Sequence, residues 1–229
     1  MFYRFLKLFV VGPLIRLLFR PWSKGLENIP RSGAAILASN HLSFLDPVFL
    51  PVVEDRSISF LAKSEYFTGK GVKGWLSRRF FLAIRQLPID RSGGQASESS
   101  LGAGLGHLAD GGLLGIYPEG TRSLDGRLYK GRTGAARMVL EARVPVVPIA
   151  MVGTFEVMPS GAKLPRFKKV GVIAGEPLDF SRFWGRQNDG DVLRQITEEI
   201  MQAIQRLSGQ VYVDEYAPKR RRKAVSARS

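Results

Sequence analysis

The sequence predicts a single α/β domain with a mixed, largely parallel sheet flanked by helices. Short apolar runs typical of β-strands alternate with longer helical segments along most of the chain. With 229 residues, the chain has the length of one domain with a sizeable core. Hydrophobic residues make up 45% and charged residues 24%, which are ordinary proportions for a globular protein. We therefore expect a folded chain outside its two ends.

The expected elements follow from the hydrophobic pattern. Strands are expected at residues 34–39, 57–62, 82–89, 112–117, 144–153 and 169–175. Helices are expected at residues 47–53, 65–81, 95–109, 131–143 and 191–207. The run at 144–153 contains two prolines, which cannot donate to a sheet ladder, so we expect that strand to be irregular or partly at an edge.

The net charge of +14 is concentrated at the two ends of the chain. Residues 1–24 carry five cations and no acid, and residues 219–229 carry six cations and no acid. The region between them is nearly balanced. This distribution favours contact with an anionic surface over nucleic-acid binding by the folded domain.

The N-terminal segment is strongly apolar, with cations every few residues. Its longest uncharged run, Leu8 to Ile15, is eight residues long and contains Gly12 and Pro13. A bilayer-crossing helix needs about 20 apolar residues, and no small-residue cleavage site of a secretory signal follows. We expect two short interfacial helices hinged at Gly12 and Pro13. The alternative is a terminal helix that packs on the protein's own core.

The composition also restricts the chemistry. The chain has no cysteine and only two histidines, which argues against thiol nucleophiles, disulfides, iron–sulfur clusters and Cys/His zinc sites. Neither a phosphate-binding G-x-x-x-x-G-K-[ST] loop nor a G-x-S-x-G nucleophile elbow occurs. We expect neither a metal nor a bound cofactor.

The segment SNHLSFLDP, residues 39–47, contains the pair His41 and Asp46 after the first expected strand. Imidazole is the commonest general base near neutral pH, and a carboxylate on its second nitrogen fixes the tautomer. A separation of five does not fit one helix face, so His41 is expected on the turn before the helix. Asp46 followed by Pro47 is also typical of a helix N-cap, and the spacing leaves both roles open.

The segment YPEGTRS, residues 117–123, follows the fourth expected strand. An arginine beside a hydroxyl and a glycine at a strand end can bind phosphate, because guanidinium offers two parallel donors and glycine lets backbone N–H groups approach. Glu119 would hold a substrate or a basic neighbour, and a polar turn without chemistry is the alternative. Asp90 and Arg91 offer a second phosphate clamp, or a plain surface arginine. Since ligands bind beyond the carboxyl ends of such strands, we expect the His41 and Glu119 segments to share a cleft.

Taken together, these segments resemble a known family. NHLSFLD (residues 40–46) followed by PEGTRS (residues 118–123) resembles the paired motifs of the glycerolipid acyltransferases, most closely the 1-acylglycerol-3-phosphate acyltransferases. PIDR (residues 88–91) and VPVVPI (residues 144–149) resemble further blocks of that family in the same order, and the resemblance covers roughly residues 25–175. It implies His41 as the base, Asp46 as its orienting partner, and an acceptor site that includes Arg91, Glu119, Gly120, Thr121 and Arg122.

The activity implied by the resemblance is transfer of a fatty acyl group from acyl-CoA or acyl carrier protein to the free hydroxyl of 1-acylglycerol 3-phosphate. The product would be phosphatidic acid for phospholipid biosynthesis. Related enzymes also acylate other lysophospholipids, glycerol 3-phosphate or glycolipids. Two further readings stay open, an acyl-thioester hydrolase and a basic module that binds membrane surfaces or nucleic acid without catalysis.

The expected organisation follows from the same observations. Residues 1–24 would form amphipathic membrane-associating helices, residues 25–210 an acyltransferase domain, and residues 211–229 a basic tail. The expected partners are lysophosphatidic acid, an acyl thioester and an anionic membrane surface, with acyl carrier protein as an optional donor and no nucleic acid. The expected location is the cytoplasmic face of the cell membrane.

Overall fold

The computed structural model describes residue 9 and residues 11–64, 67–83, 86–89, 95–162 and 164–218. Within these residues, a seven-stranded sheet has the order β1-β8-β7-β2-β5-β3-β4. Only the β7–β8 pair in this sheet is antiparallel. The strands are β1 (Trp22–Lys24), β2 (Ala35–Ser39), β3 (Ile58–Lys63), β4 (Gln86–Ile89), β5 (Leu113–Ile116), β7 (Val146–Val152) and β8 (Gly171–Ala174). The predicted α/β domain with a largely parallel sheet is confirmed.

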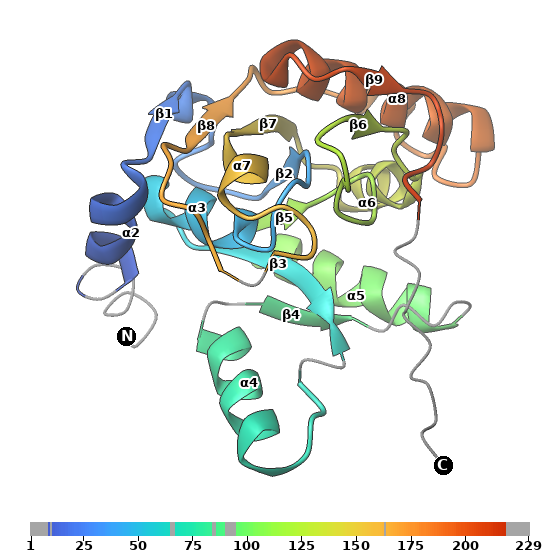
Figure 1. Cartoon of the computed structure of the whole chain (residues 1–229). Coiled ribbons are helices and arrows are strands. Elements are labelled where there is room, and N and C mark those ends of the chain that lie inside the picture. The colour runs from blue at the N-terminus through green and yellow to red at the C-terminus, as the bar shows by residue number, and fades with distance from the viewer. Residues whose placement is uncertain are drawn as a thin grey trace, which may run out of the picture.

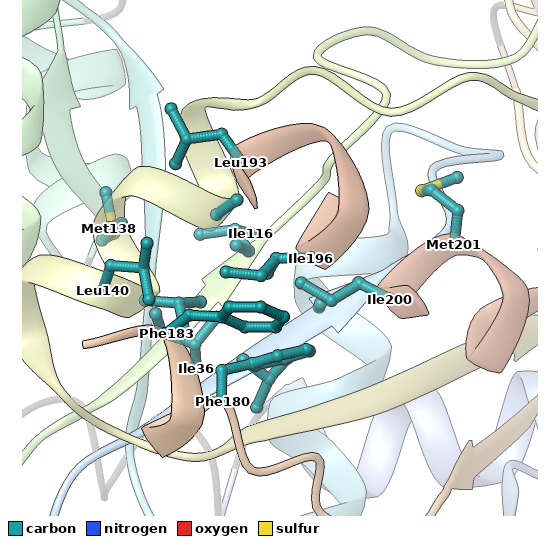
Figure 2. Close-up of a cluster of buried hydrophobic side chains, with 14 of the residues drawn as sticks. Ile36, Ile116, Met138, Leu140, Phe180, Phe183, Leu193, Ile196, Ile200 and Met201 are labelled. Carbon is teal, nitrogen blue, oxygen red and sulfur yellow. The ribbon is translucent and has the colours of Figure 1, made fainter. Parts of the chain in front are cut away.

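Helices flank this sheet on both faces (Figure 1). The described helices are α2 (Gly12–Phe19), α3 (Asp46–Val53), α4 (Gly71–Ala83), α5 (Gln95–Ala109), α6 (Gly134–Ala142), α7 (Thr154–Val157) and α8 (Gly190–Ser208). Side chains alternate along each strand, so β2 sends Ile36 and Ala38 into one apolar cluster and Ala35 and Leu37 into another. The first cluster lies under α6 and α8, and Figure 2 shows Ile36 there together with side chains of α8. The second cluster lies under α2 and α3.

Most predicted elements are found within a few residues of their expected bounds, and α5 has the bounds predicted for it. The strand expected at 82–89 is shorter, because α4 continues to Ala83 and β4 begins at Gln86. No glycine or proline interrupts residues 75–85, so nothing in that stretch stops the helix early. At its other end α4 begins only at Gly71, which has a φ of +70°.

The strand at 144–153 was expected to be irregular or partly at an edge, and the edge position is wrong. β7 lies inside the sheet, between β8 and β2. Pro145 precedes the strand, and the carbonyl of Pro148 accepts from the N–H of Gly175, one residue beyond the end of β8. The missing N–H of Pro148 therefore falls just beyond the β7–β8 ladder, and antiparallel pairing resumes at Val146, which exchanges two backbone hydrogen bonds with Leu178.

The second half of the N-terminal segment forms a helix that starts at the expected hinge. In α2, Ile15 and Phe19 pack into the second cluster, and the ring of Phe19 meets that of Phe49 edge-on at 5.2 Å. Leu14 and Leu17 are exposed. No helix among the described residues is long and apolar enough to cross a membrane. Residues 1–8 and 10, and the end of the basic tail at 219–229, lie outside the described residues.

A second small sheet was not predicted. It pairs β6 (Leu128–Tyr129) in parallel with β9 (Tyr212–Val213), and thereby attaches the segment after α8 to the domain. β1, at residues 22–24, likewise joins the main sheet. The division of the chain at residues 24 and 211 stays a prediction, and the structure adds that short strands lie next to both positions.

Candidate active site

His41 lies on the turn between β2 and α3, and Asp46 is the first residue of α3. The His41 Nδ1 atom is 2.9 Å from Oδ2 of Asp46, and the same oxygen accepts from the backbone N–H groups of Leu42 at 2.7 Å and Ser43 at 2.8 Å. Asp46 is fully buried, whereas the His41 side chain keeps 17% of its surface exposed. The carboxylate thus both shapes the turn and orients the imidazole.

The N-cap role that the spacing left open for Asp46 is not observed. Asp46 is the first residue of α3, Leu45 occupies the N-cap position, and no side chain caps this helix end. The two N–H groups bound by Asp46 belong to the turn before the helix. An oxygen that already accepts from two backbone N–H groups accepts from the imidazole as well, so Nδ1 carries the proton and Nε2 the lone pair.

Tyr117 covers one face of the His41 imidazole. The two rings are stacked with centroids 3.8 Å apart and planes 12° apart, and Phe60 lies behind Tyr117 at 5.7 Å. Burial, followed by the charge of Asp46, raises the pKa of Tyr117 well above its ordinary value, so the phenol stays neutral. The stack fixes the plane of the imidazole. This contact was not predicted, because Tyr117 entered only as the residue before the PEGTRS motif.

Glu119 joins the two motifs through the backbone. Its Oε2 accepts from the N–H of His41 at 3.1 Å, and its Oε1 accepts from the N–H of Tyr129 at 2.9 Å. A second link is formed by the N–H of Ser123, which donates to the carbonyl of His41 at 2.8 Å. The predicted proximity of the two segments is therefore observed. Both oxygens of Glu119 are bound by the protein itself, which indicates a structural role beside the substrate-binding role expected for it.

Burial raises the pKa of Glu119 to about 7, although its two backbone hydrogen bonds act in the opposite direction. The negative charges of Asp46 and Asp125 add to the rise. Desolvation of the charged form is the larger effect here because Glu119 is only 1% exposed. In the folded protein, this buried carboxyl group therefore changes from its protonated to its ionised form near neutral pH.

The rest of the PEGTRS segment faces the His41 turn. Gly120 has a φ of +74°, and a Cβ there would lie 3.0 Å from Cδ of Arg132, so a larger residue is disfavoured. Thr121 is half-buried, and the guanidinium of Arg122 lies 6.0 Å from the ring of Phe44, a residue of the His41 turn. Arg122 thus lies beside the His41 turn. Arg91 and its neighbour Asp90 lie outside the described residues.

A cavity of about 390 Å³ adjoins Tyr117, the residue that follows β5. Apolar side chains from β3, β5, α5 and α6 form most of its wall, and two arginines provide its charge. Its lining includes Leu61, Leu101, Tyr117, Arg132, Arg137 and Met138. The cavity is suited to a ligand with both an apolar and an anionic part.

Asn40, the residue before His41, is fixed from two sides. Its side chain exchanges hydrogen bonds with the backbone of Met151, donating to the carbonyl at 3.1 Å and accepting from the N–H at 2.7 Å. Its Nδ2 also donates to Oε1 of Gln210 at 2.6 Å, and Gln210 donates onward to the carbonyl of Gly126 at 2.7 Å. Nothing in the pattern around Gln210 identified this residue as part of the site.

The raised pKa of Glu119 predicts a pH-dependent stability. Below pH 4.5, which is the ordinary pKa of the group, the Glu119 carboxyl is protonated in the folded and the unfolded protein. Between pH 4.5 and about 7 it ionises only in the unfolded protein. The free energy of unfolding should therefore fall across this window, by on the order of 3 kcal/mol. Glu119→Gln cannot titrate, so the advantage of the wild type over this variant should shrink as the pH rises from 5 to 8.

Urea unfolding at pH 5, 6, 7 and 8 measures this difference. Glu119→Gln loses one acceptor for a backbone N–H, so it should be the less stable protein at low pH. Glu176→Gln, at an exposed position, is the matched control and should follow the wild type throughout. A wild-type advantage that stays constant with pH would contradict the raised pKa.

Comparison with known proteins agrees with this geometry. A family model described as "Acyltransferase" matches residues 21–152. The chloroplastic 1-acyl-sn-glycerol-3-phosphate acyltransferase LPAT1 of Arabidopsis thaliana is 32% identical over 161 residues, which are 69% of this chain and 44% of the plant protein. The chain thus spans less than half of that relative.

A bacterial relative is covered more fully. The 1-acyl-sn-glycerol-3-phosphate acyltransferase of Bacillus subtilis is 30% identical over 190 residues, which are 81% of this chain and 86% of that protein. Among solved structures, the 1-acyl-sn-glycerophosphate acyltransferase PlsC of Thermotoga maritima superposes with a TM-score of 0.67 at 25% identity, covering 90% of this chain and 79% of that one. On these matches and on the paired motifs at His41 and Glu119, the chain belongs to the acyltransferase family.

Proposed function

We propose that this protein moves a fatty acyl group from acyl-CoA or acyl carrier protein to the free hydroxyl of 1-acylglycerol 3-phosphate, forming phosphatidic acid for phospholipid biosynthesis. The observation that carries the proposal is the His41 imidazole, bound at Nδ1 by buried Asp46 at 2.9 Å and still partly exposed. The relatives from Bacillus subtilis and Arabidopsis thaliana that are named for this acceptor support the choice of substrate.

In the proposed mechanism, Nε2 of His41 takes the hydroxyl proton while the hydroxyl oxygen attacks the thioester carbonyl. A C–O bond forms, the C–S bond breaks, and the imidazolium returns its proton to the leaving thiolate. Asp46 stabilises the imidazolium through Nδ1, and the neutral ring of Tyr117 keeps the imidazole plane in place. General-base catalysis of this kind contributes on the order of 100- to 10,000-fold. The reaction calls for no acyl-enzyme, metal or bound cofactor.

The acceptor phosphate is assigned to the arginine of the PEGTRS segment. Arg122 faces the His41 turn across the ring of Phe44, and guanidinium matches the geometry of phosphate oxygens. Thr121 and the N–H groups around Gly120 lie on the same turn, and Arg91 is expected to assist. Positioning the phosphate here would bring the free hydroxyl of the same molecule toward His41.

The protein is proposed to work at the cytoplasmic face of the cell membrane, where its lipid acceptor resides. The exposed Leu14 and Leu17 of α2, on the face opposite the buried Ile15 and Phe19, support this location. An amphipathic helix of this kind lies in the interface with its apolar side chains at the acyl boundary.

Release of free thiol from a long-chain acyl-CoA tests the reaction directly. We expect release to depend on added lysophosphatidic acid, with phosphatidic acid identified by mass. Glycerol 3-phosphate, other lysophospholipids and a glycolipid acceptor should react more slowly in the same assay. Thiol release at full rate without any acceptor would show a thioester hydrolase instead, because the same pair would then activate water.

Substitution of the pair tests the assignment of the base. His41→Ala should lose at least about 100-fold in kcat, and Asp46→Asn should lower kcat severely, because the imidazole loses its partner for Nδ1. Thermal melting of both variants separates these losses from unfolding. The only other histidine is the control: His107 contacts the carbonyl of Leu113 at 3.1 Å, and His107→Gln should keep its activity. A His41→Ala variant that is active at neutral pH would refute the assignment.

Arg122→Ala tests the phosphate site. We expect the KM for the phosphate-bearing acceptor to rise much more than the KM for the acyl donor, because a guanidinium bound to phosphate acts mainly in substrate binding. Arg206→Ala, on the exposed side of α8, is the matched control and should change neither constant. Equal increases for donor and acceptor would instead place the CoA phosphates at Arg122.

A further inference from the structure

An exposed loop with apolar and basic side chains lies beside α2. The segment between α7 and β8 exposes Leu164 by 80% and Phe167 by 65%, and α2 exposes Leu14 by 54% and Leu17 by 73%. We call residues 164–169 the basic loop, and the basic loop together with the outer face of α2 the α2–loop surface. Large apolar side chains this exposed are not part of the core, so they are available to a partner.

A ring contact with the buried face of α2 places the basic loop beside this helix. Phe167 of the basic loop meets Phe19 of α2 edge-on, with ring centroids 5.6 Å apart, and Phe19 in turn meets Phe49 of α3. In Figure 1 the orange segment that precedes β8 lies near α2 and α3. Residues some 150 positions apart in sequence are thereby held side by side on the domain.

The charge of the surface has one sign. Residues 157–175 contain four cations and no acid, and residues 11–26 contain three cations and no acid. Arg20, Arg166, Lys168 and Lys169 are exposed in the structure. Exposed aromatic and leucine side chains flanked by cations match a lipid surface, because apolar groups enter the acyl boundary while ammonium and guanidinium groups meet lipid phosphates.

The basic loop also leads to the catalytic turn. The Ser43 hydroxyl, on the His41 turn, donates to the carbonyl of Met158 at 3.0 Å. The chain continues from Met158 to the basic loop, where the N–H of Arg166 donates back to the carbonyl of Val157 at 2.8 Å. One connection therefore begins at the turn that holds the base and ends against α2.

We propose that the α2–loop surface docks on an anionic phospholipid bilayer, and that docking through the basic loop holds the His41 turn at the membrane surface. The identity of the acceptor as a membrane lipid rests on the proposed function, whereas the docking itself does not. The basic loop is thereby a membrane-contacting element in addition to the N-terminal segment.

Co-sedimentation of the full chain with vesicles tests the docking. Vesicles of pure phosphatidylcholine are compared with vesicles containing phosphatidylglycerol, at low and high salt, without substrate. Lys168→Gln with Lys169→Gln should weaken partitioning onto the anionic vesicles roughly tenfold at low salt and little at high salt. Leu164→Ser with Phe167→Ser should weaken binding to both vesicle types, at both salt concentrations, because the apolar contribution is not screened.

Two controls make the outcomes decisive. Val211→Ser changes a side chain with 68% exposure beside β9 and should leave partitioning unchanged. Transfer to a short-chain, water-soluble acceptor should stay at the wild-type rate in all of these variants, so a failed activity proposal is recognised separately from failed docking. Phe167 contacts Phe19, so the two serine substitutions could lower the melting temperature. In that case the variant with both lysines replaced is the one that tests the proposal.

Partitioning of the lysine pair within twofold of the wild type would overturn the proposal. It would also be overturned if vesicle binding were unchanged while transfer from acyl carrier protein fell, because the surface would then dock an acidic protein instead.

Discussion

The site depends on one buried carboxylate oxygen. Oδ2 of Asp46 accepts from the imidazole of His41 and from two backbone N–H groups of the same turn, all within 2.9 Å. A buried carboxylate is costly unless hydrogen-bonded donors surround it, so the turn has to close around this atom. Closure sets the path of the chain from β2 into α3 and the direction of the imidazole at once. Asp46, which would stabilise an imidazolium at His41, therefore also holds the turn on which His41 lies.

The second motif extends the same principle. Glu119 binds the N–H of His41 with one oxygen and the N–H of Tyr129 with the other, which joins the turn after β2 to the small β6–β9 sheet. Because β2 and β5 are parallel neighbours, the segments that follow them emerge at the same edge of the sheet. The raised pKa of Glu119 reflects the cost of burying this connection. Two motifs nearly 80 residues apart are thereby hydrogen-bonded to each other and, through Tyr129, to the sheet that holds the C-terminal segment.

Much of this architecture could be predicted from sequence, and the exceptions have physical causes. Short apolar runs predicted β2 and β5, whose side chains are buried on both faces of the sheet, and longer helical segments predicted α5 and α8. The position of Pro148 inside the sheet depends on where β8 ends, which no local pattern contains. The His41 turn and the PEGTRS segment were found because their residue types are unusual, and the resemblance connected them. Tyr117 and Gln210 were missed because their roles come from packing between segments 76 and 170 residues apart.

The central claim is that Asp46 holds the His41 ring protonated at Nδ1, so that Nε2 is the base. Nitrogen-15 NMR of the imidazole rings measures this tautomer directly, and the chain has only two histidines, so His107→Gln leaves a single set of ring signals. We predict a protonated Nδ1 and an unprotonated Nε2 at neutral pH, with the preference lost in Asp46→Asn. A His41 ring that carries its proton on Nε2 in the wild-type protein at neutral pH would contradict the assignment.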